Sequence, residues 1–133
     1  HLTAALDRPD TTWFVSLLDV NPSGVGALVT KGWLRASHRA TSVDAVQPYK
    51  VHHPHTGAEP VPVGVPVEYA IDLGETSQYF RPGHRIAIEI KAQDGDAVHF
   101  WHHGEPHEVR HDIGYGPGAV SKLLLPVIPP GAR

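Results

Sequence analysis

Two segments of the chain alternate apolar and polar residues, which is the pattern of a half-buried β-strand. In Pro66–Leu73 the apolar side chains take the odd positions, and in His84–Lys91 isoleucines take the even ones. A Pro-Gly pair just before the second segment is typical of a turn. We expect the apolar faces of both strands to point to the core: Val67, Tyr69, Ile71 and Leu73 in the first, and Ile86, Ile88 and Ile90 in the second.

Four further segments have the composition of strands. Thr12–Val20 is apolar or β-prone on both faces, which indicates a central strand that is covered on both sides. Leu28–Ser37 predicts another strand, with Gly32 as a β-bulge. Leu2–Leu6 and Ala119–Val127 predict strands near the two ends of the sequence.

Two stretches lack this periodicity. Ala40–Pro62 carries four prolines and predicts a long loop, and loops of that length usually cover something. Gln93–Gly118 is rich in His, Gly and Pro, and no repeat or linker divides the chain. Six short strands without a helical stretch predict an all-β fold, an antiparallel β-sandwich that forms one domain over residues 1–133. The long crossing loops favour a jelly roll over a meander.

Composition limits the partners and the chemistry. A chain of 133 residues has the size of one ordinary domain, and its net charge of -3 argues against a nucleic-acid-binding surface. No apolar run approaches the ~20 residues that span a bilayer, so we expect no membrane partner. The absence of Cys excludes disulfides, thiol catalysis and thiolate zinc sites, but it does not choose a cellular compartment.

One motif matches a zinc-hydrolase signature. Residues 107–111 read H-E-V-R-H, in which His107 and His111 would bind zinc and Glu108 would act as general base. The signature requires a helix, and the proline before it and the glycine after it leave room for only about two turns. The third ligand of the extended motif would fall on Pro117, which cannot ligate through its side chain. We therefore expect no metal site here.

Further histidines cluster in two loops. Neutral imidazoles are common metal ligands, but a tight site also needs a rigid frame and hydrogen-bond partners that orient each ring. Loops rich in Pro and Gly do not provide that frame, so we interpret these histidines as polar loop residues. We expect no cofactor, and we expect any bound metal to be adventitious: the residues are His52, His53 and His55, and His99, His102 and His103.

Nucleophilic catalysis is not expected from this chain. None of its six serines lies in G-x-S-x-G, the strained turn that exposes a catalytic serine in α/β-hydrolases. Ser37 and His38 are neighbours on an expected strand, and such neighbours point to opposite faces. We therefore assign no catalytic residue.

The order and spacing of several short motifs are more specific than any one of them. They run in sequence over nearly the whole chain, from about residue 2 to residue 130. They are Leu2–Leu6 with Asp10-Thr11-Thr12-Trp13, Leu17–Gly24 (L-L-D-V-N-P-S-G), Gly32–Arg39 (G-W-L-R-A-S-H-R), Pro48–Thr56 (P-Y-K-V-H-H-P-H-T), Thr76–Ile86 (T-S-Q-Y-F-R-P-G-H-R-I) and Ser121–Pro129 (S-K-L-L-L-P-V-I-P).

This series resembles the C-terminal non-catalytic domain of the cocaine-esterase and X-prolyl dipeptidyl-peptidase family of serine hydrolases, closest to the members described as acyl esterases. The resemblance implies a jelly-roll, galactose-binding-like β-sandwich that follows an α/β-hydrolase domain. That domain carries the Ser-His-Asp triad, and the triad matches no position here. Thr12 stands where the family often has Asp. The family domain usually starts well upstream, which leaves its first strands outside this chain and one sheet edge open.

We therefore interpret the chain as the C-terminal sandwich of a serine hydrolase that acts on esters or on peptides and amides. It would pack on the N-terminal hydrolase domain of the same polypeptide and shape substrate access. An apolar surface left uncovered without that domain predicts a homo-oligomer. The alternative is a free-standing carbohydrate-binding module with a sugar platform built from Trp13, Trp33 and Trp101, and a third, weaker reading is the zinc hydrolase.

Overall fold

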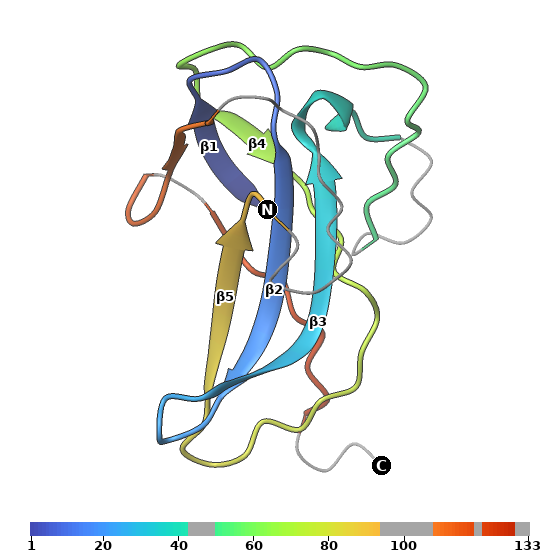
Figure 1. The fold of residues 1–133 in the computed structure, drawn as a ribbon. Coiled ribbons are helices and arrows are strands. Elements are labelled where there is room, and N and C mark those ends of the chain that lie inside the picture. Colours follow the sequence, from blue (N-terminus) through green and yellow to red (C-terminus); the bar gives the residue numbers. More distant parts are fainter. Residues whose placement is uncertain (43–49, 94–107, 119–120, 130–133) are drawn as a thin grey trace.

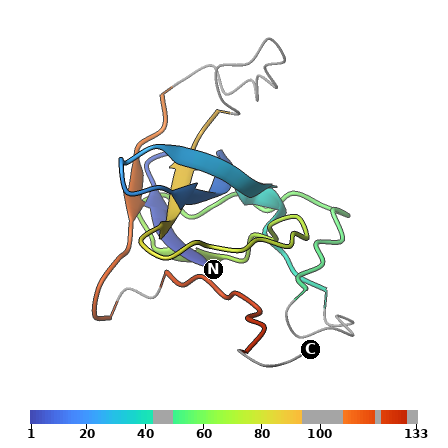
Figure 2. The ribbon, with the colours of Figure 1, turned by 90° about the horizontal axis from the view of Figure 1, so that it is seen from below.

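Two three-stranded antiparallel sheets carry the fold, as predicted for an all-β sandwich. The computed structural model describes residues 1–42, 50–93, 108–118 and 121–129. One sheet has the strand order β4-β1-β6 and the other the order β3-β2-β5, and seen from below they form two layers (Figures 1 and 2). The elements are β1 (Leu2–Leu6), β2 (Thr12–Val20), β3 (Gly26–Arg35), the 3-10 helix η1 (Ala36–His38), β4 (Val67–Tyr69), β5 (Arg85–Lys91) and β6 (His111–Ile113).

Strand β2 is the central strand that its composition predicts. It pairs with β3 on one side and with β5 on the other. Its neighbours Phe14 and Val15 point to opposite faces, and both are buried, so both faces of the strand are covered. The face that carries Trp13, Val15 and Leu17 is the inner face, because Trp13 belongs to the core between the sheets.

The core lies where the two sheets overlap. Trp13 is its largest fully buried side chain, and the ring of Tyr69 on β4 lies 5.3 Å from it between centroids. Val61, near the end of the long loop Ala40–Pro62, packs in the same cluster. This part of the loop therefore covers the core, as the length of the loop predicted. The buried members are Leu2, Ala4, Leu6, Trp13, Leu34, Ala36, Val61 and Tyr69.

Several predicted strand boundaries are wrong. Strand β3 ends at Arg35, because residues 36–38 turn into η1. Pro66–Leu73 pairs only over Val67–Tyr69; beyond the pairing Ile71 and Leu73 are half-buried on either side of the exposed Asp72. The strand predicted over Ala119–Val127 is absent from residues 121–127, and positions 119–120 lie outside the described residues.

Strand β6 was not predicted. It lies in the stretch Gln93–Gly118 and has only three residues, His111–Ile113. Three residues are too few to show a period in the sequence, and the strand forms because β1 offers it a partner, with Leu6 opposite His111. Pairing with a neighbouring strand thus decides its conformation where local pattern does not.

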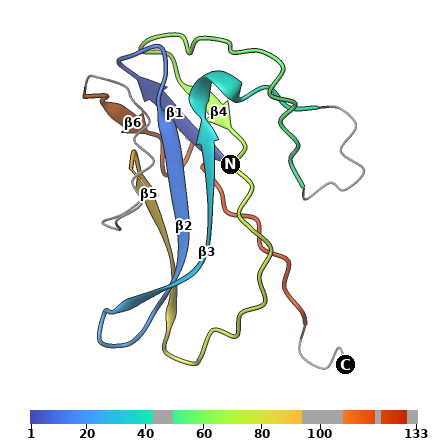
Figure 3. The ribbon, with the colours of Figure 1, turned by 45° about the vertical axis from the view of Figure 1, so that its right-hand side comes forward.

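The isoleucines of β5 lie on the predicted face, but two of them are not covered. The register places Ile86, Ile88 and Ile90 beside Asp19, Leu17 and Val15, on the inner face. Ile90 packs against the core, whereas Ile86 is 48% exposed and Ile88 is 39% exposed. The reason is length, since β2 has 9 residues and β1 has 5. Figure 3 shows β2, β3 and β5 continuing below the region that β1 and β4 cover.

Gly32 is not the bulge that was predicted. The register shifts between Leu17 and Leu18 instead, which leaves Val29 without a cross-strand partner. A Cβ on Gly32 would clash with the backbone carbonyl of Asp72, so a glycine is needed because a second chain segment crosses there.

Gly32→Ala is therefore expected to destabilise the protein by about 1–3 kcal/mol or more, because backbone must shift to make room for one methyl group. The matched control is Gly57→Ala, where nothing lies within 4 Å of an added Cβ. That variant should match or slightly exceed the wild-type stability, because alanine restricts the unfolded chain. Urea unfolding measures both, and an equal effect of the two substitutions would contradict the close approach at Gly32.

Candidate functional site

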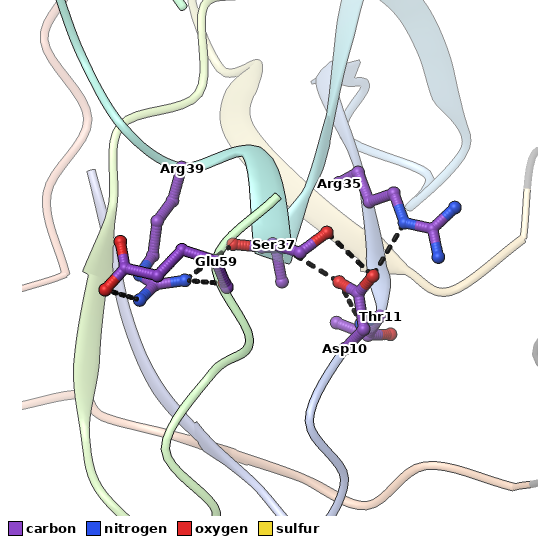
Figure 4. Close-up of polar contacts among 7 residues, drawn as sticks. Asp10, Thr11, Arg35, Ser37, Arg39 and Glu59 are labelled. Atoms are coloured by element: carbon purple, nitrogen blue, oxygen red, sulfur yellow. Dashed lines mark hydrogen bonds and ion pairs between the residues drawn. The ribbon is translucent and has the colours of Figure 1, made fainter. Parts of the chain in front are cut away.

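Asp10 is the most densely hydrogen-bonded carboxylate in the described part of the chain. Its Oδ1 accepts from the backbone N–H groups of Thr11, at 3.0 Å, and Ser37, at 2.8 Å. Its Oδ2 accepts from Nε of Arg35 at 2.6 Å and from Oγ of Ser37 at 2.8 Å. Figure 4 shows these donors converging on the carboxylate from the end of β3 and from η1.

The geometry makes Asp10 a structural anion. Burial by itself would raise the pKa of its carboxyl, but the hydrogen bonds from Arg35 and Ser37 and the charge of the guanidinium outweigh burial and hold the pKa below its ordinary value. The Ser37 hydroxyl donates to this carboxylate, whose lowered pKa makes it a poor base for the proton of a serine nucleophile. The Ser37 hydroxyl is therefore engaged in holding Asp10. Its direction is set by the turn of η1 and not, as the sequence argument assumed, by the alternation of side chains along a strand.

A second ion pair fastens η1 to the long loop. Nη1 of Arg39 donates to the carbonyl oxygens of Ala36, at 3.3 Å, and Glu59, at 2.6 Å. Nη2 of Arg39 lies 3.1 Å from Oε1 of Glu59, and Figure 4 shows the two side chains beside the Asp10 cluster. Together the two groups hold the β1–β2 connection, η1 and the loop in one place. These contacts have a structural role, and we call the hydrogen bonds of Asp10 with Arg35 and Ser37 the Asp10 clamp.

The zinc motif does not lie on a helix over its described residues. His107 falls outside the described residues. Glu108 lies in neither a helix nor a strand, and His111 is the first residue of strand β6. In extended backbone, side chains four residues apart do not converge on one metal ion as they do across one turn of a helix. The structure therefore offers no frame for the H-E-x-x-H chemistry in this part of the motif.

His111 serves the core instead. Its ring packs on Trp13, with the centroids 4.5 Å apart, and its Nε2 lies 2.9 Å from Oγ1 of Thr11 in a hydrogen bond. Burial lowers the pKa of His111, and the carboxylate of Asp7 opposes that shift only in part. The neutral imidazole is thus the form that the folded protein favours.

Stability is consequently expected to fall with acid because of His111. Above its ordinary pKa of about 6.5 the residue is neutral in both states, and as pH falls toward the lower folded pKa only the unfolded chain takes up the proton. His111→Phe keeps a ring on Trp13 and should flatten the loss of stability between about pH 6.5 and 5. Urea unfolding across that range, with exposed His52→Gln as control, measures it; unchanged slopes in His111→Phe would contradict this role.

Two histidines of the first loop cluster, His53 and His55, contact other parts of the fold. Nδ1 of His53 lies 2.9 Å from the carbonyl oxygen of Ala40, and its Nε2 lies 2.8 Å from that of Ala70. The ring of His55 faces that of His38, with centroids 5.4 Å apart. Among the described residues no group of three or more His, Asp or Glu is placed to hold a metal ion. His99, His102 and His103 lie outside the described residues.

The tryptophans do not form one platform. Trp13 is fully buried, Trp33 is 62% exposed on the outer face of β3, and Trp101 lies outside the described residues. In the register, Trp33 stands beside Phe14 on the outer face, so of the two described tryptophans only Trp33 offers an exposed indole.

Asp19 forms a second polar cluster that the sequence did not reveal. This buried residue lies on the inner face of β2, with its Oδ1 2.7 Å from Nδ1 of His84 and its Oδ2 3.1 Å from Nε2 of Gln78. The sequence did contain a signal for this cluster: Asp19 stands among the inward-facing apolar residues of a central strand, and a buried carboxylate requires a polar partner. The cluster holds the segment before β5 against β2. In the described part of the chain, no helix is long and apolar enough to cross a membrane.

Comparison with known proteins gives the family. A family model described as the X-Pro dipeptidyl-peptidase C-terminal non-catalytic domain matches residues 1–112. Two proteins, each named a putative serine esterase, from Mycobacterium bovis and Mycobacterium tuberculosis, are each 43% identical to the chain over 96 residues. The match covers 68% of this chain but only 15% of either relative, so the chain spans a small part of their length. No solved structure matches.

Proposed function

The chain belongs to the family of X-Pro dipeptidyl-peptidase C-terminal non-catalytic domains, and we propose that it is the C-terminal sandwich of a serine hydrolase. The catalytic domain would precede it in the same polypeptide. The length of the mycobacterial relatives supports this proposal, because the matched region is a minor share of each. Their names favour an ester as the substrate class, while the family description favours an X-Pro peptide bond.

The observation that carries a docking role is an apolar strip on the outer face of β3. Trp33 and Leu28 are each more than half exposed there, and Val25 is equally exposed in the turn that precedes the strand. On β2 their neighbours in the register are Phe14, which is buried, and Leu18, which is half-buried, and Lys31 lies between Leu28 and Trp33 on this face, so the exposed apolar side chains are confined to β3 and the turn before it. A solvated sheet face is ordinarily polar, so large apolar side chains that are more than half exposed on it mark a surface that packs on a partner.

The role of this domain is then to pack on the catalytic domain and to shape the entrance to its site. The Asp10 clamp and the Asp19 cluster supply rigidity, because each joins segments far apart in the sequence. A rigid wall beside an active site excludes substrates by shape without contributing a catalytic group. The sandwich of jelly-roll, galactose-binding-like type stays our expectation for the complete domain.

A carbohydrate-binding module is the second candidate, favoured by the exposed indole of Trp33. A flat sugar platform uses several aromatic rings in one plane. The other aromatic side chains that are largely exposed in the described residues, Tyr79 and Tyr115, lie in segments outside the sheets. The docking role therefore explains more of the surface than sugar binding does.

The test uses the parent enzyme and compares Trp33→Ser with Tyr115→Ser, which alters a highly exposed side chain outside the strip. We expect Trp33→Ser to lower both the melting temperature and kcat/KM for an ester substrate of the parent. Tyr115→Ser should leave both unchanged. If Trp33→Ser leaves the melting temperature and kcat/KM of the parent unchanged but abolishes polysaccharide binding, the docking role is wrong and sugar recognition takes its place.

The isolated chain is expected to be catalytically silent toward an activated ester and an X-Pro amide, because none of its serines lies in a G-x-S-x-G turn and the described residues of the zinc motif form no helix. Turnover by the pure chain that survives a chelator and is lost on mutation of one of its own serines would contradict this. The assay also separates the proposal from the zinc hypothesis, since a zinc hydrolase would lose activity to the chelator.

A further inference from the structure

Strand β5 lies at an edge of its sheet. It pairs with β2 on one side, and the strand order β3-β2-β5 leaves its other side without a strand among the described residues, as Figure 1 shows. Two of its isoleucines, Ile86 and Ile88, are exposed on the inner face. An exposed apolar edge strand presents unpaired N–H and C=O groups to a further strand, so this edge is a surface suited to pairing.

Hydrogen bonds at the two ends of β2 show which backbone groups face that edge. The N–H of Ala36 donates to the carbonyl oxygen of Thr11 at 2.8 Å, and the N–H of Asn21 donates to that of Val25 at 2.9 Å. Odd-numbered residues of β2 therefore direct their backbone groups to β3 and even-numbered residues direct theirs to β5, because this direction alternates along a strand. The register with β5 then leaves three residues with backbone groups at the free edge: Ile86, Ile88 and Ile90.

The opposite face of β5 carries charges of both signs. Arg85 and Glu89 lie on this face with Ala87 midway between them. Arg85 is exposed and has no ion-pair partner in the described part of the chain, whereas Glu89 pairs with Lys91 at 3.0 Å. When two such strands lie antiparallel with Ala87 against Ala87, each Arg85 stands opposite Glu89 of the other copy. The strand is thus complementary to itself in charge.

We propose that two copies of this chain associate along the free edges of β5, antiparallel about a two-fold axis at Ala87. Ile86 of one copy and Ile88 of the other then form hydrogen-bonded pairs, because the backbone groups of both point to the edge. The side chains of these pairs lie together on the inner face and cover one another. On the opposite face, Arg85 and Glu89 pair twice, with their Cβ atoms about 4.5–5.5 Å apart.

Charge selects this register from the others that the hydrogen-bond pattern permits. Sliding one copy by two residues sets Arg85 opposite Lys91 in one direction and opposite Ala87 in the other. A slide of four residues sets Glu89 against itself, and like charges directly opposite each other are destabilising. A further slide pairs Glu89 with Lys91 but leaves Ile86 outside the pairing. The register centred on Ala87 therefore satisfies the charges and covers both isoleucines.

This association is independent of the docking proposed above. Strands β3 and β5 are the opposite edges of one sheet, so pairing through β5 leaves the strip around Trp33 free to pack on the catalytic domain. A two-fold interface uses the same surface of both copies, so the assembly closes at two. The homo-oligomer that the sequence predicted thereby acquires an interface and a register.

Charge reversal tests the register. Arg85→Glu places a second carboxylate opposite Glu89, Glu89→Arg places a second guanidinium opposite Arg85, and the double variant restores both pairs in swapped order. By sedimentation velocity over a concentration series, we expect the wild type to form dimers. Each single variant should raise the dissociation constant at least about tenfold, and the double variant should recover. Arg8→Glu, an exposed site between β1 and β2, is the control and should dimerise as the wild type does.

A symmetric disulfide tests the axis. The chain has no cysteine, so Ala87→Cys introduces a single thiol, and non-hydrogen-bonded pairs bring Cα atoms to a separation that a disulfide spans. In the chain and in the parent enzyme, we expect Ala87→Cys to form a covalent dimer at least about tenfold faster than the more exposed Leu28→Cys on β3. Equal rates at the two positions would overturn the inference, as would a cross-link absent from the parent. A wild type monomeric up to about 1 mM, or a folded double charge variant that stays monomeric, would also overturn it.

Discussion

Replacing Trp13 with alanine is expected to lower the free energy of unfolding by about 3–5 kcal/mol. Trp13 is fully buried, and the rings of Tyr69 and His111 pack against it from β4 and β6. Its indole nitrogen has no hydrogen-bond partner among the described residues, so the loss is one of packing. Because domains of this kind have only about 5–15 kcal/mol to lose, the variant should unfold at a much lower urea concentration.

Trp33 supplies the matched control, because it carries the same side chain on the neighbouring strand and is 62% exposed. Trp33→Ala in the isolated chain should change the stability by no more than about 0.5 kcal/mol. Urea unfolding followed by far-UV circular dichroism measures both variants without relying on indole fluorescence. Comparable losses in the two would mean that the core is not centred on Trp13.

Asp10→Asn should have the second largest effect, a loss of about 2–3 kcal/mol. The substitution removes the charge that Arg35 faces, and it places an amide N–H₂ among groups that all donate. The control is Asp112→Asn, which also removes an Asp–Arg pair, with Arg110 at 3.1 Å, but at an exposed site. That change should cost at most about 0.5 kcal/mol, because surface ion pairs contribute little.

The Asp10 clamp also predicts a pH dependence. Its pKa is lower in the folded protein, so the stabilisation is complete above the ordinary Asp value of about 3.9 and is lost as pH falls through the folded pKa. Asp10→Asn should therefore lack part of the acid-side loss that the wild type shows below about pH 4. Parallel acid transitions in the two proteins would contradict the assigned protonation state.

The strands that the sequence predicted best are those whose pattern is long. The bounds of Leu2–Leu6 and Thr12–Val20 agree with β1 and β2. In β2, nine consecutive apolar or β-prone residues indicate a strand that is buried on both faces. By contrast, β4 and β6 have three paired residues each, and they form because they pair with β1. Local pattern thus locates the strands that organise the sheets, and pairing decides the short ones at the edges.

The polar clusters were less accessible to sequence reasoning. Asp10 stands in the motif that supports the family resemblance, but its role depends on the pairing of Thr12 with Arg35, which brings the residues just before β2 opposite those just after β3. The close approach at Gly32 likewise depends on where the segment after β4 crosses. Each is a consequence of register, and register is not written in any single segment.

The most direct measurement labels the parent polypeptide with a fluorophosphonate probe that reacts with activated serines, followed by mass spectrometry of the labelled peptide. We expect one labelled serine, upstream of His1 and within a G-x-S-x-G turn, and no label on any of the six serines of this chain. A label on one of those six serines, or none anywhere in an ester-hydrolysing parent, would contradict a non-catalytic domain attached to a serine hydrolase.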